Sequence, residues 1–156
     1  MSDMPRNPSE FTRVSGPPMF LLVHPDAVMP SYATPASACF DISTISEDFT
    51  IYPGEISRCR TGLCINPAAS IWDRHYLMLF ARSGLASKGI SLANGVGIVD
   101  SDYRDEIMVL LQNTSRTAHP IKKGDRIAQG MVWARWSVDL EVKDTTRSGG
   151  FGSTGR

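Results

Sequence analysis

The segment 94–106, which reads NGVGIVDSDYRDE, places three aspartates and a tyrosine in a short turn between two apolar stretches. Strand interiors disfavour aspartate, and carboxylates of catalytic sites act as acids and bases. Aspartate is also a common turn former, so a solvated turn has the same composition. On this segment alone both interpretations stay open for Asp100, Asp102 and Asp105.

A second segment, RSGLASKG at 82–89, has residues suited to phosphate. The guanidinium of Arg82 presents a planar fork of donors. Ser83 adds a hydroxyl, and Gly84 allows a close approach of the backbone. Loops of this kind bind phosphates, although an ordinary turn with an exposed arginine would have the same sequence features. The spacing is not that of a Walker A loop.

The C-terminal residues 147–156, RSGGFGSTGR, surround one aromatic residue with glycines and hydroxyls. Phe151 is suited to stacking on a base, and Arg147, Ser153 and Thr154 are suited to binding phosphate. A glycine-rich tail without a ligand has the same composition. With the 82–89 loop and the acidic turn, the pattern indicates a nucleotide ligand.

A nucleoside triphosphate would repel these carboxylates unless Mg²⁺ lies between them, and Mg²⁺ favours oxygen ligands and retained waters. Asp41, in the strand-like segment ACFDISTI, is our candidate for holding a metal-bound water, although an edge-strand aspartate facing water is the alternative. One carboxylate near the attacked phosphorus would serve as general base, a contribution of about 10²–10⁴-fold in rate.

The elements that must position these residues are strands. No long segment keeps a helical period, and turn signals separate roughly ten short segments rich in β-branched and aromatic residues, which predicts an all-β sandwich or barrel. The predicted strands are Met19–His24, Ala38–Ile45, Phe49–Tyr52, Ile56–Thr61, Leu63–Ile65, Tyr76–Ala81, Ile90–Val99, Ile107–Leu111, Arg126–Trp136 and Val138–Val142.

Within this pattern, Ile107–Leu111 lacks alternation and is expected to be buried on both faces. Residues 67–75 are expected to hold a single helical turn, and Lys122–Asp125 to form a hairpin turn. The expected packing residues of the penultimate strand are Ile127, Val132, Trp133 and Trp136.

The chain is expected to form one domain, with a flexible N-terminal arm at 1–18, a core at 19–142 and a mobile C-terminal arm at 143–156. The net formal charge is zero, which disfavours nucleic acid as a partner. Three cysteines without a CxxC pair suit a reducing compartment. With no signal peptide or spanning segment, we expect no membrane partner, no secretion and a cytoplasmic location, or a nuclear or host-cytosol one if the source is eukaryotic or viral.

In order, the motifs ACFDIST, RSGLASKG, NGVGIVDSDYRDEI, GDRIAQ and RSGGFGSTG across residues 38–155 resemble the trimeric deoxyuridine triphosphatase (dUTPase) family. The resemblance implies a jelly-roll-like β subunit, a homotrimer with shared active sites, and Mg²⁺ bound to the triphosphate. It implies hydrolysis of dUTP to dUMP and pyrophosphate, which limits uracil incorporation into DNA and supplies dUMP for thymidylate synthesis.

Matched by position, the resemblance also implies roles for individual residues. Asp100 corresponds to the general base, Tyr103 to the ring under the deoxyribose that excludes a 2′-hydroxyl, and Asp41 to the acid that orients a metal-bound water. The substrate-binding positions it implies are Arg82, Ser83, Gly84, Asn94, Gly97, Tyr103, Gln129, Arg147, Phe151, Gly152, Ser153 and Thr154.

The chain departs from the family pattern at Cys39 and Asp105, which replace glycines, at Ala81, which replaces a proline, and in an Arg147-to-Phe151 spacing one residue shorter than usual. Two alternatives remain beside dUTP hydrolysis. A dCTP deaminase of the same fold would need a glutamate as catalytic acid and base, for which Glu106 is available. A dUTP-binding regulatory protein would use the pocket as a switch, with residues 1–18 as its distinguishing feature.

Overall fold

The structure is a computed structural model that describes residues 17–141. These residues form twelve strands, one single-turn α-helix and one 3-10 turn, so the expected all-β class is confirmed. Most of the expected N-terminal arm and all of the C-terminal arm, including Arg147, Phe151, Gly152, Ser153 and Thr154, lie outside the described residues.

The elements are β1 Phe20–Leu22, β2 Ser31–Tyr32, β3 Phe40–Ser43, β4 Phe49–Ile51, β5 Ile56–Arg60, β6 Leu63–Ile65, η2 Ser70–Asp73, β7 His75–Phe80, α1 Ser83–Ala86, β8 Ile90–Leu92, β9 Gly97–Val99, β10 Met108–Asn113, β11 His119–Ile121 and β12 Arg126–Ala134.

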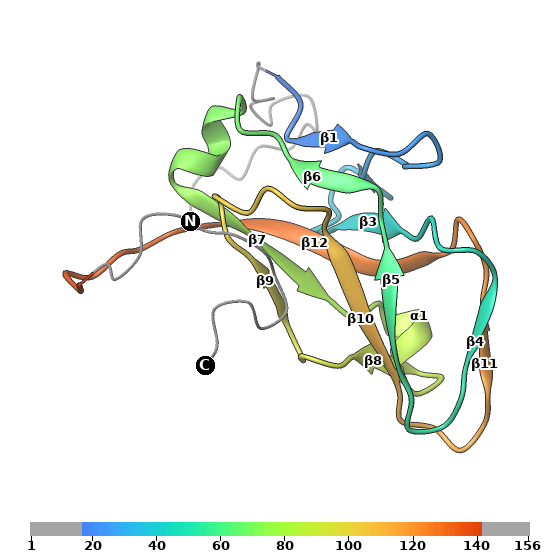
Figure 1. Cartoon of the computed structure of the whole chain (residues 1–156). Helices are drawn as coiled ribbons and strands as arrows, with labels where there is room; N and C mark the ends of the chain where they lie inside the picture. The colour runs from blue at the N-terminus through green and yellow to red at the C-terminus, as the bar shows by residue number, and fades with distance from the viewer. Residues whose placement is uncertain (1–16, 142–156) are drawn as a thin grey trace.

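The strands assemble into two larger sheets and two paired ribbons (Figure 1). The five-stranded sheet has the order β2-β3-β12-β7-β9, and the three-stranded sheet has the order β5-β10-β8. β1 pairs with β6, and β11 with β4. All pairings between these strands are antiparallel, which is typical of sandwiches and jelly rolls.

The hydrophobic core lies where the sheets face each other. Leu77 and Leu79 of β7 and Ile127 of β12 contribute from the five-stranded sheet, and Val109 and Leu111 of β10 from the three-stranded one. Alternate residues of β7 and β10 are buried, because successive side chains of a strand point to opposite faces. This alternation leaves the outer faces available for other contacts.

The structure corrects three expectations about packing. Ile107–Leu111 is not buried on both faces, since Met108 and Leu110 are only half-buried. In β12, Ile127 is buried and Val132 packs against the core, but Trp133 is 51% exposed and Trp136 is 89% exposed. Their apolar character suggested packing, whereas Trp133 points to the outer face and Trp136 lies beyond the end of the strand.

Three further expectations concern the last strand, a helical turn and a hairpin. Residues 138–141 form no strand. The helical turn expected within 67–75 is η2. The turn at Lys122–Asp125 is present, with Gly124 at a φ of 87°, but it does not close a hairpin, because β11 pairs with β4 and β12 pairs with β3 and β7.

Candidate functional site

The carboxylate of Asp41 lies between two guanidinium groups. Its Oδ1 accepts a hydrogen bond from Nε of Arg82 at 2.8 Å, and its Oδ2 accepts one from Nη1 of Arg126 at 2.9 Å. Nη1 of Arg82 also donates to the backbone carbonyl of Arg126 at 3.2 Å. Asp41 is therefore an interior-strand residue in a charged cluster, and the alternative of an edge-strand aspartate facing water is not borne out.

Sheet register explains how residues so far apart in sequence meet. Gln129 of β12 lies opposite both Asp41 of β3 and Phe80 of β7. β7 ends at Phe80, and α1 begins three residues later at Ser83, so Arg82 lies just beyond the end of β7, where it reaches Asp41. Nε2 of Gln129 donates to the carbonyl of Ala81 at 2.9 Å, which fixes the backbone just before Arg82.

This cluster has the chemistry of an anion site. Two guanidinium groups and one carboxylate leave one net positive charge, and arginine donors match phosphate oxygens. Ser83 and Gly84 are exposed beside it at the start of α1. Each carboxylate oxygen of Asp41 accepts one arginine donor, and a carboxylate has about four acceptor positions, so Asp41 retains capacity to accept from a water.

That capacity fits a metal bound mainly by substrate oxygens and waters, the coordination that Mg²⁺ prefers. Asp41 would hold such an ion through a bound water. Within residues 17–141, no group of three or more His, Cys, Asp or Glu side chains is arranged to hold a metal ion.

A cavity of about 150 Å³ opens between the sheets, where the chain crosses from β8 to β9. β8 pairs with β10 of the three-stranded sheet, whereas β9 pairs with β7 of the five-stranded sheet, so these two strands form no hairpin with each other. The turn at 93–96 spans the gap, with Gly95 at a φ of 71°. The cavity's lining includes Asn94, Gly97, Ile98, Tyr103, Met108 and Leu110.

Gly97 allows β9 to lie close to β7. A Cβ atom at this position would approach Cβ of Leu79 to 3.0 Å, which is tighter than most real contacts. The glycine thereby leaves backbone groups facing the cavity beside Asn94. Backbone groups and one amide side chain are the kind of polar lining that orients a base in an otherwise apolar pocket.

Tyr103 supplies an aromatic wall to the same cavity. Its hydroxyl donates to the carbonyl of Glu106 at 3.2 Å, and its backbone N–H donates to the carbonyl of Asp100 at 3.1 Å. Burial, helped by the charge of Asp105, raises the pKa of Tyr103 above its usual range. The phenol is therefore neutral at physiological pH, and its hydroxyl bond orients the ring while the backbone bond holds the turn that carries it.

Asp100 lines a neighbouring cavity of about 520 Å³ with Tyr76, Ser101, Asp102 and Arg135. Ile98 lines both cavities, so the two adjoin at β9. Because Asp100 is half-buried and lines this larger cavity, its carboxylate is placed to meet a ligand that extends beyond the smaller cavity.

The predicted site residues thus fall into two groups. Asp41, Arg82 and Gln129 form one cluster, while Asn94, Gly97, Tyr103 and Asp100 surround the adjoining cavities. Three strand spacings separate β3 from β9, which is roughly 14 Å at about 4.8 Å per strand.

Sequence reasoning missed Arg126 and Glu106 as structural members of this region. Arg126 belongs to the GDRIAQ motif and pairs with Asp41, and its position one residue after an acidic turn was the only local signal. Glu106 had been considered as a deaminase acid, but its carboxylate binds Gly62 and Arg60, and among the described residues it does not line the cavity.

Comparison with known proteins identifies the fold's relatives. A sequence profile of the dUTPase family matches residues 26–155. The chain belongs to the dUTPase family. A deoxyuridine 5'-triphosphate nucleotidohydrolase of Desulfitobacterium hafniense is 45% identical over 136 residues, covering 81% of this chain and 87% of the relative. That of Helicobacter pylori is 38% identical over 139 residues, covering 85% and 92%.

A solved structure agrees with this assignment at the level of fold. A mutant dUTPase from phage phi11 of S. aureus, described as coordinating a structural Mg(II) ion, matches with a TM-score of 0.68. The match covers 83% of this chain and 97% of the phage protein at 19% identity. The dUTPase-like jelly-roll architecture expected from the sequence is therefore confirmed. In residues 17–141, no helix has the length and apolar character required to cross a bilayer.

Proposed function

We propose that this protein hydrolyses dUTP to dUMP and pyrophosphate. The observation that carries the proposal is the cavity between the two sheets, in which Asn94, Gly97 and Tyr103 combine polar groups with an aromatic wall. The relatives at 45% and 38% identity are named for the same activity. Such a protein would keep uracil out of DNA and supply dUMP for thymidylate synthesis.

The deoxyuridine enters the smaller cavity in this proposal. The backbone near Gly97 and the amide of Asn94 read the base edge, and Tyr103 packs against the sugar and leaves no space for a 2′-hydroxyl. Support comes from the half-buried ring of Tyr103, whose hydroxyl is bound to the carbonyl of Glu106, on a turn held by the backbone N–H of Tyr103. A neutral phenol against an apolar sugar face costs no charge desolvation.

Asp100 acts as the general base. It takes a proton from water while the water oxygen forms a bond to the α-phosphorus, and the bond from that phosphorus to the bridging oxygen breaks to release pyrophosphate. Support comes from the position of Asp100 in the cavity that adjoins the deoxyuridine cavity. General-base catalysis of this kind contributes about 10²–10⁴-fold, or roughly 3–5.5 kcal/mol of the barrier.

The triphosphate binds to the cluster of Arg82, Ser83, Gly84 and Gln129, with Asp41 holding a water of the bound Mg²⁺. The ion would neutralise the triphosphate and polarise its oxygens. The net positive charge of the Asp41–Arg82–Arg126 cluster supports this assignment.

The active site is shared between subunits of a homotrimer. Within one chain, Asp41, the proposed holder of the metal-bound water, lies three strand spacings from β9, which lines the deoxyuridine cavity, whereas a nucleotide and its metal ion must contact both. An adjacent subunit would bring its cluster to this chain's cavity. The exposed apolar residues Ile98 and Trp133 on the outer face support such a contact.

The C-terminal residues complete the proposed site, with Phe151 over the uracil and Arg147, Gly152, Ser153 and Thr154 over the phosphates. These residues lie outside the described part of the chain, so the assignment rests on their motif alone. A reducing cytosolic location is also proposed, because Cys39, Cys59 and Cys64 are free thiols.

The test is pyrophosphate release by the purified protein with Mg²⁺ and each deoxynucleoside triphosphate in turn. We expect release from dUTP alone. Ammonia release from dCTP would support the deaminase instead, and dUTP binding without turnover would support a regulatory protein. No observation favours either alternative, and Glu106, which a deaminase would need, is bound to Arg60 and Gly62.

A further inference from the structure

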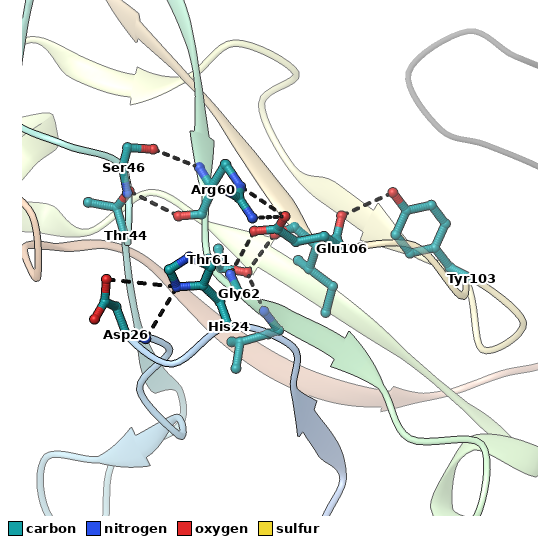
Figure 2. Close-up of polar contacts among 11 residues, drawn as sticks. His24, Asp26, Thr44, Ser46, Arg60, Thr61, Gly62, Tyr103 and Glu106 are labelled. Atoms are coloured by element: carbon teal, nitrogen blue, oxygen red, sulfur yellow. Dashed lines mark hydrogen bonds and ion pairs between the residues drawn. The ribbon is translucent and has the colours of Figure 1, made fainter.

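The segment that follows Tyr103 is fastened to the turn between β5 and β6 by an acidic side chain. Oε1 of Glu106 accepts a hydrogen bond from the backbone N–H of Gly62 at 2.8 Å (Figure 2). Oε2 of Glu106 accepts from Nε of Arg60 at 3.0 Å and lies 2.9 Å from Nη2 of the same guanidinium. The two contacts join positions 44 and 46 residues apart in the sequence.

Neighbouring contacts reinforce this junction. The hydroxyl of Thr61 donates to the carbonyl of Ile107, and the N–H of Ile107 donates to the carbonyl of Leu63 at 2.7 Å. Arg60 is itself held, because its N–H donates to Oγ of Ser46 at 3.0 Å. Figure 2 shows Glu106 between this anchored turn on one side and Tyr103 on the other.

The conformation of the turn between β5 and β6 directs the backbone N–H of Gly62 towards Glu106. Gly62 has a φ of 67°, a conformation that other residues rarely adopt. A Cβ atom there would approach Cβ of Ala27 to 2.7 Å, so the position excludes a side chain. Gly62 is buried, so without the Glu106 carboxylate its N–H would lack an acceptor in a place that water does not easily reach.

Glu106 also holds Tyr103 through its backbone, since the carbonyl of Glu106 accepts a hydrogen bond from the Tyr103 hydroxyl at 3.2 Å. The side chain of Glu106 therefore fixes the backbone atom that fixes the tyrosine. We propose that Glu106 is a positioning residue for the 2′-deoxynucleoside pocket, and that its carboxylate keeps Tyr103 in the conformation that accepts deoxyribose. This inference rests on the proposed function, because the role of the pocket comes from it.

The two contacts of Glu106 differ in weight. Its carboxylate is 15% exposed, whereas Arg60 is 49% exposed, and an ion pair with a well-solvated partner contributes little. The bond to the buried N–H of Gly62 is therefore the stronger constraint. Glutamine at position 106 would keep a carbonyl oxygen for Gly62 and lose only the charge, whereas alanine would lose both.

The consequence for catalysis is a change in binding. If only a fraction of the protein molecules holds Tyr103 in place, the apparent affinity for dUTP is reduced in proportion to that fraction. At saturating dUTP the bound molecules all have Tyr103 in place, so kcat changes little. For Glu106→Ala we expect KM for dUTP to rise about tenfold with kcat within about threefold of wild type. The preference in kcat/KM for dUTP over UTP should also fall about tenfold, because a mobile ring no longer excludes the 2′-hydroxyl.

The experiment measures kcat and KM for dUTP and UTP, and calorimetric binding of dUMP and UMP, with the full-length wild type and the variants Glu106→Ala, Glu106→Gln and Arg60→Gln. The matched control is Arg116→Gln, an exposed arginine in the β10–β11 connection, which should behave as wild type. We expect Glu106→Gln and Arg60→Gln to lie between wild type and Glu106→Ala.

Two results would overturn the inference. One is a folded Glu106→Ala protein with wild-type KM and dUTP preference. The other, decisive if the alanine variant fails to fold, is a folded Glu106→Asp variant, measured in the same way, that binds dUMP and discriminates against UMP as the wild type does, because aspartate is one methylene too short to keep its carboxylate at the N–H of Gly62. A wild type that binds dUMP without hydrolysing dUTP would reject the proposed function alone, and weaker dUMP binding by Glu106→Ala would still support the positioning role.

Discussion

Nε of Arg82 donates to Oδ1 of Asp41 at 2.8 Å across a sequence separation of 41 residues. Oδ2 of the same carboxylate binds Arg126, so Asp41 holds two arginines, one just after the end of β7 and one at the start of β12. Replacement by asparagine would remove the charge that both guanidinium groups face. The pairing thus connects the stability of the contacts between β3, β12 and the loop after β7 to the proposed phosphate site.

For Asp41→Asn we expect a higher Mg²⁺ concentration for half-maximal activity, because the proposed metal-bound water loses its anionic acceptor. We also expect the free energy of unfolding to fall by about 1–2 kcal/mol, between the values for exposed and for buried ion pairs. Mg²⁺ titration of dUTP hydrolysis and urea unfolding measure the two effects. Asp73→Asn, an exposed acid in η2, is the matched control, and an unchanged Mg²⁺ dependence in Asp41→Asn would remove Asp41 from the metal site.

Asp100→Asn should lower kcat by about 10²–10⁴-fold, because the amide cannot accept the proton from water. Binding of a non-hydrolysable imido analogue of dUTP should stay within a few-fold of wild type. Steady-state pyrophosphate release and calorimetry test this pair of expectations. Asp102→Asn, an exposed acid in the same turn, should keep most of its turnover. Equal turnover in Asp100→Asn and wild type would exclude Asp100 as the base.

Gly84→Ala separates phosphate binding from stability. A Cβ atom at Gly84 would meet no atom within 4 Å, and alanine favours helix over glycine by about 1 kcal/mol. We therefore expect unchanged or slightly higher thermal stability, together with weaker triphosphate binding if phosphate oxygens approach this backbone. Calorimetry with dUMP and with the imido analogue of dUTP shows whether the loss of binding is specific to the triphosphate. Loss of dUMP and analogue binding to the same extent would argue against a phosphate contact at Gly84.

Trp133 tests the proposed assembly. It is 51% exposed on the outer face of β12, where a charged replacement would face any apposed subunit. Trp133→Lys should shift the protein from trimer towards monomer in light scattering at micromolar concentration, with a matching loss of dUTP turnover. Tyr52→Lys, at a side chain that is 62% exposed beyond β4, should leave both unchanged. A wild-type monomer would contradict the shared active site.

Cys59 makes stability depend on pH in the alkaline range. Burial raises the pKa of its thiol to about 12, compared with about 8.5 in an unfolded chain. Between these values the unfolded state binds fewer protons than the folded state, so the free energy of unfolding falls as pH rises. At about pH 10.5 the loss amounts to about 2–3 kcal/mol relative to neutral pH.

Thermal melts between about pH 8 and pH 10.5 check this expectation. Cys59→Val should show a smaller decrease of Tm over that range, because it removes the thiol while keeping an apolar side chain in the core. Cys39→Ser, at a half-buried cysteine, should keep most of the wild-type slope. Identical slopes in wild type and Cys59→Val would show that Cys59 does not contribute.

The sequence by itself determined the features that depend on local chemistry. Turn residues and β-branched segments predicted an all-β domain, and most strands lie within two residues of their expected positions. The five motifs predicted the dUTPase family, which the match to residues 26–155 confirms. These predictions succeeded because turn formation, the alternation of apolar and polar residues, and motif chemistry all depend on residues that are close together in the sequence.

Only the tertiary structure decided which strands pair and what the side chains of the site contact. Residues 90–99 read as one broken strand, yet β8 and β9 belong to different sheets, and the cavity lies where the chain crosses between them. The pairing of Asp41 with Arg126 and of Glu106 with Gly62 spans 85 and 44 residues. Local pattern holds no information about such partners, because an antiparallel ladder can form with any strand that buries its apolar face and matches its register.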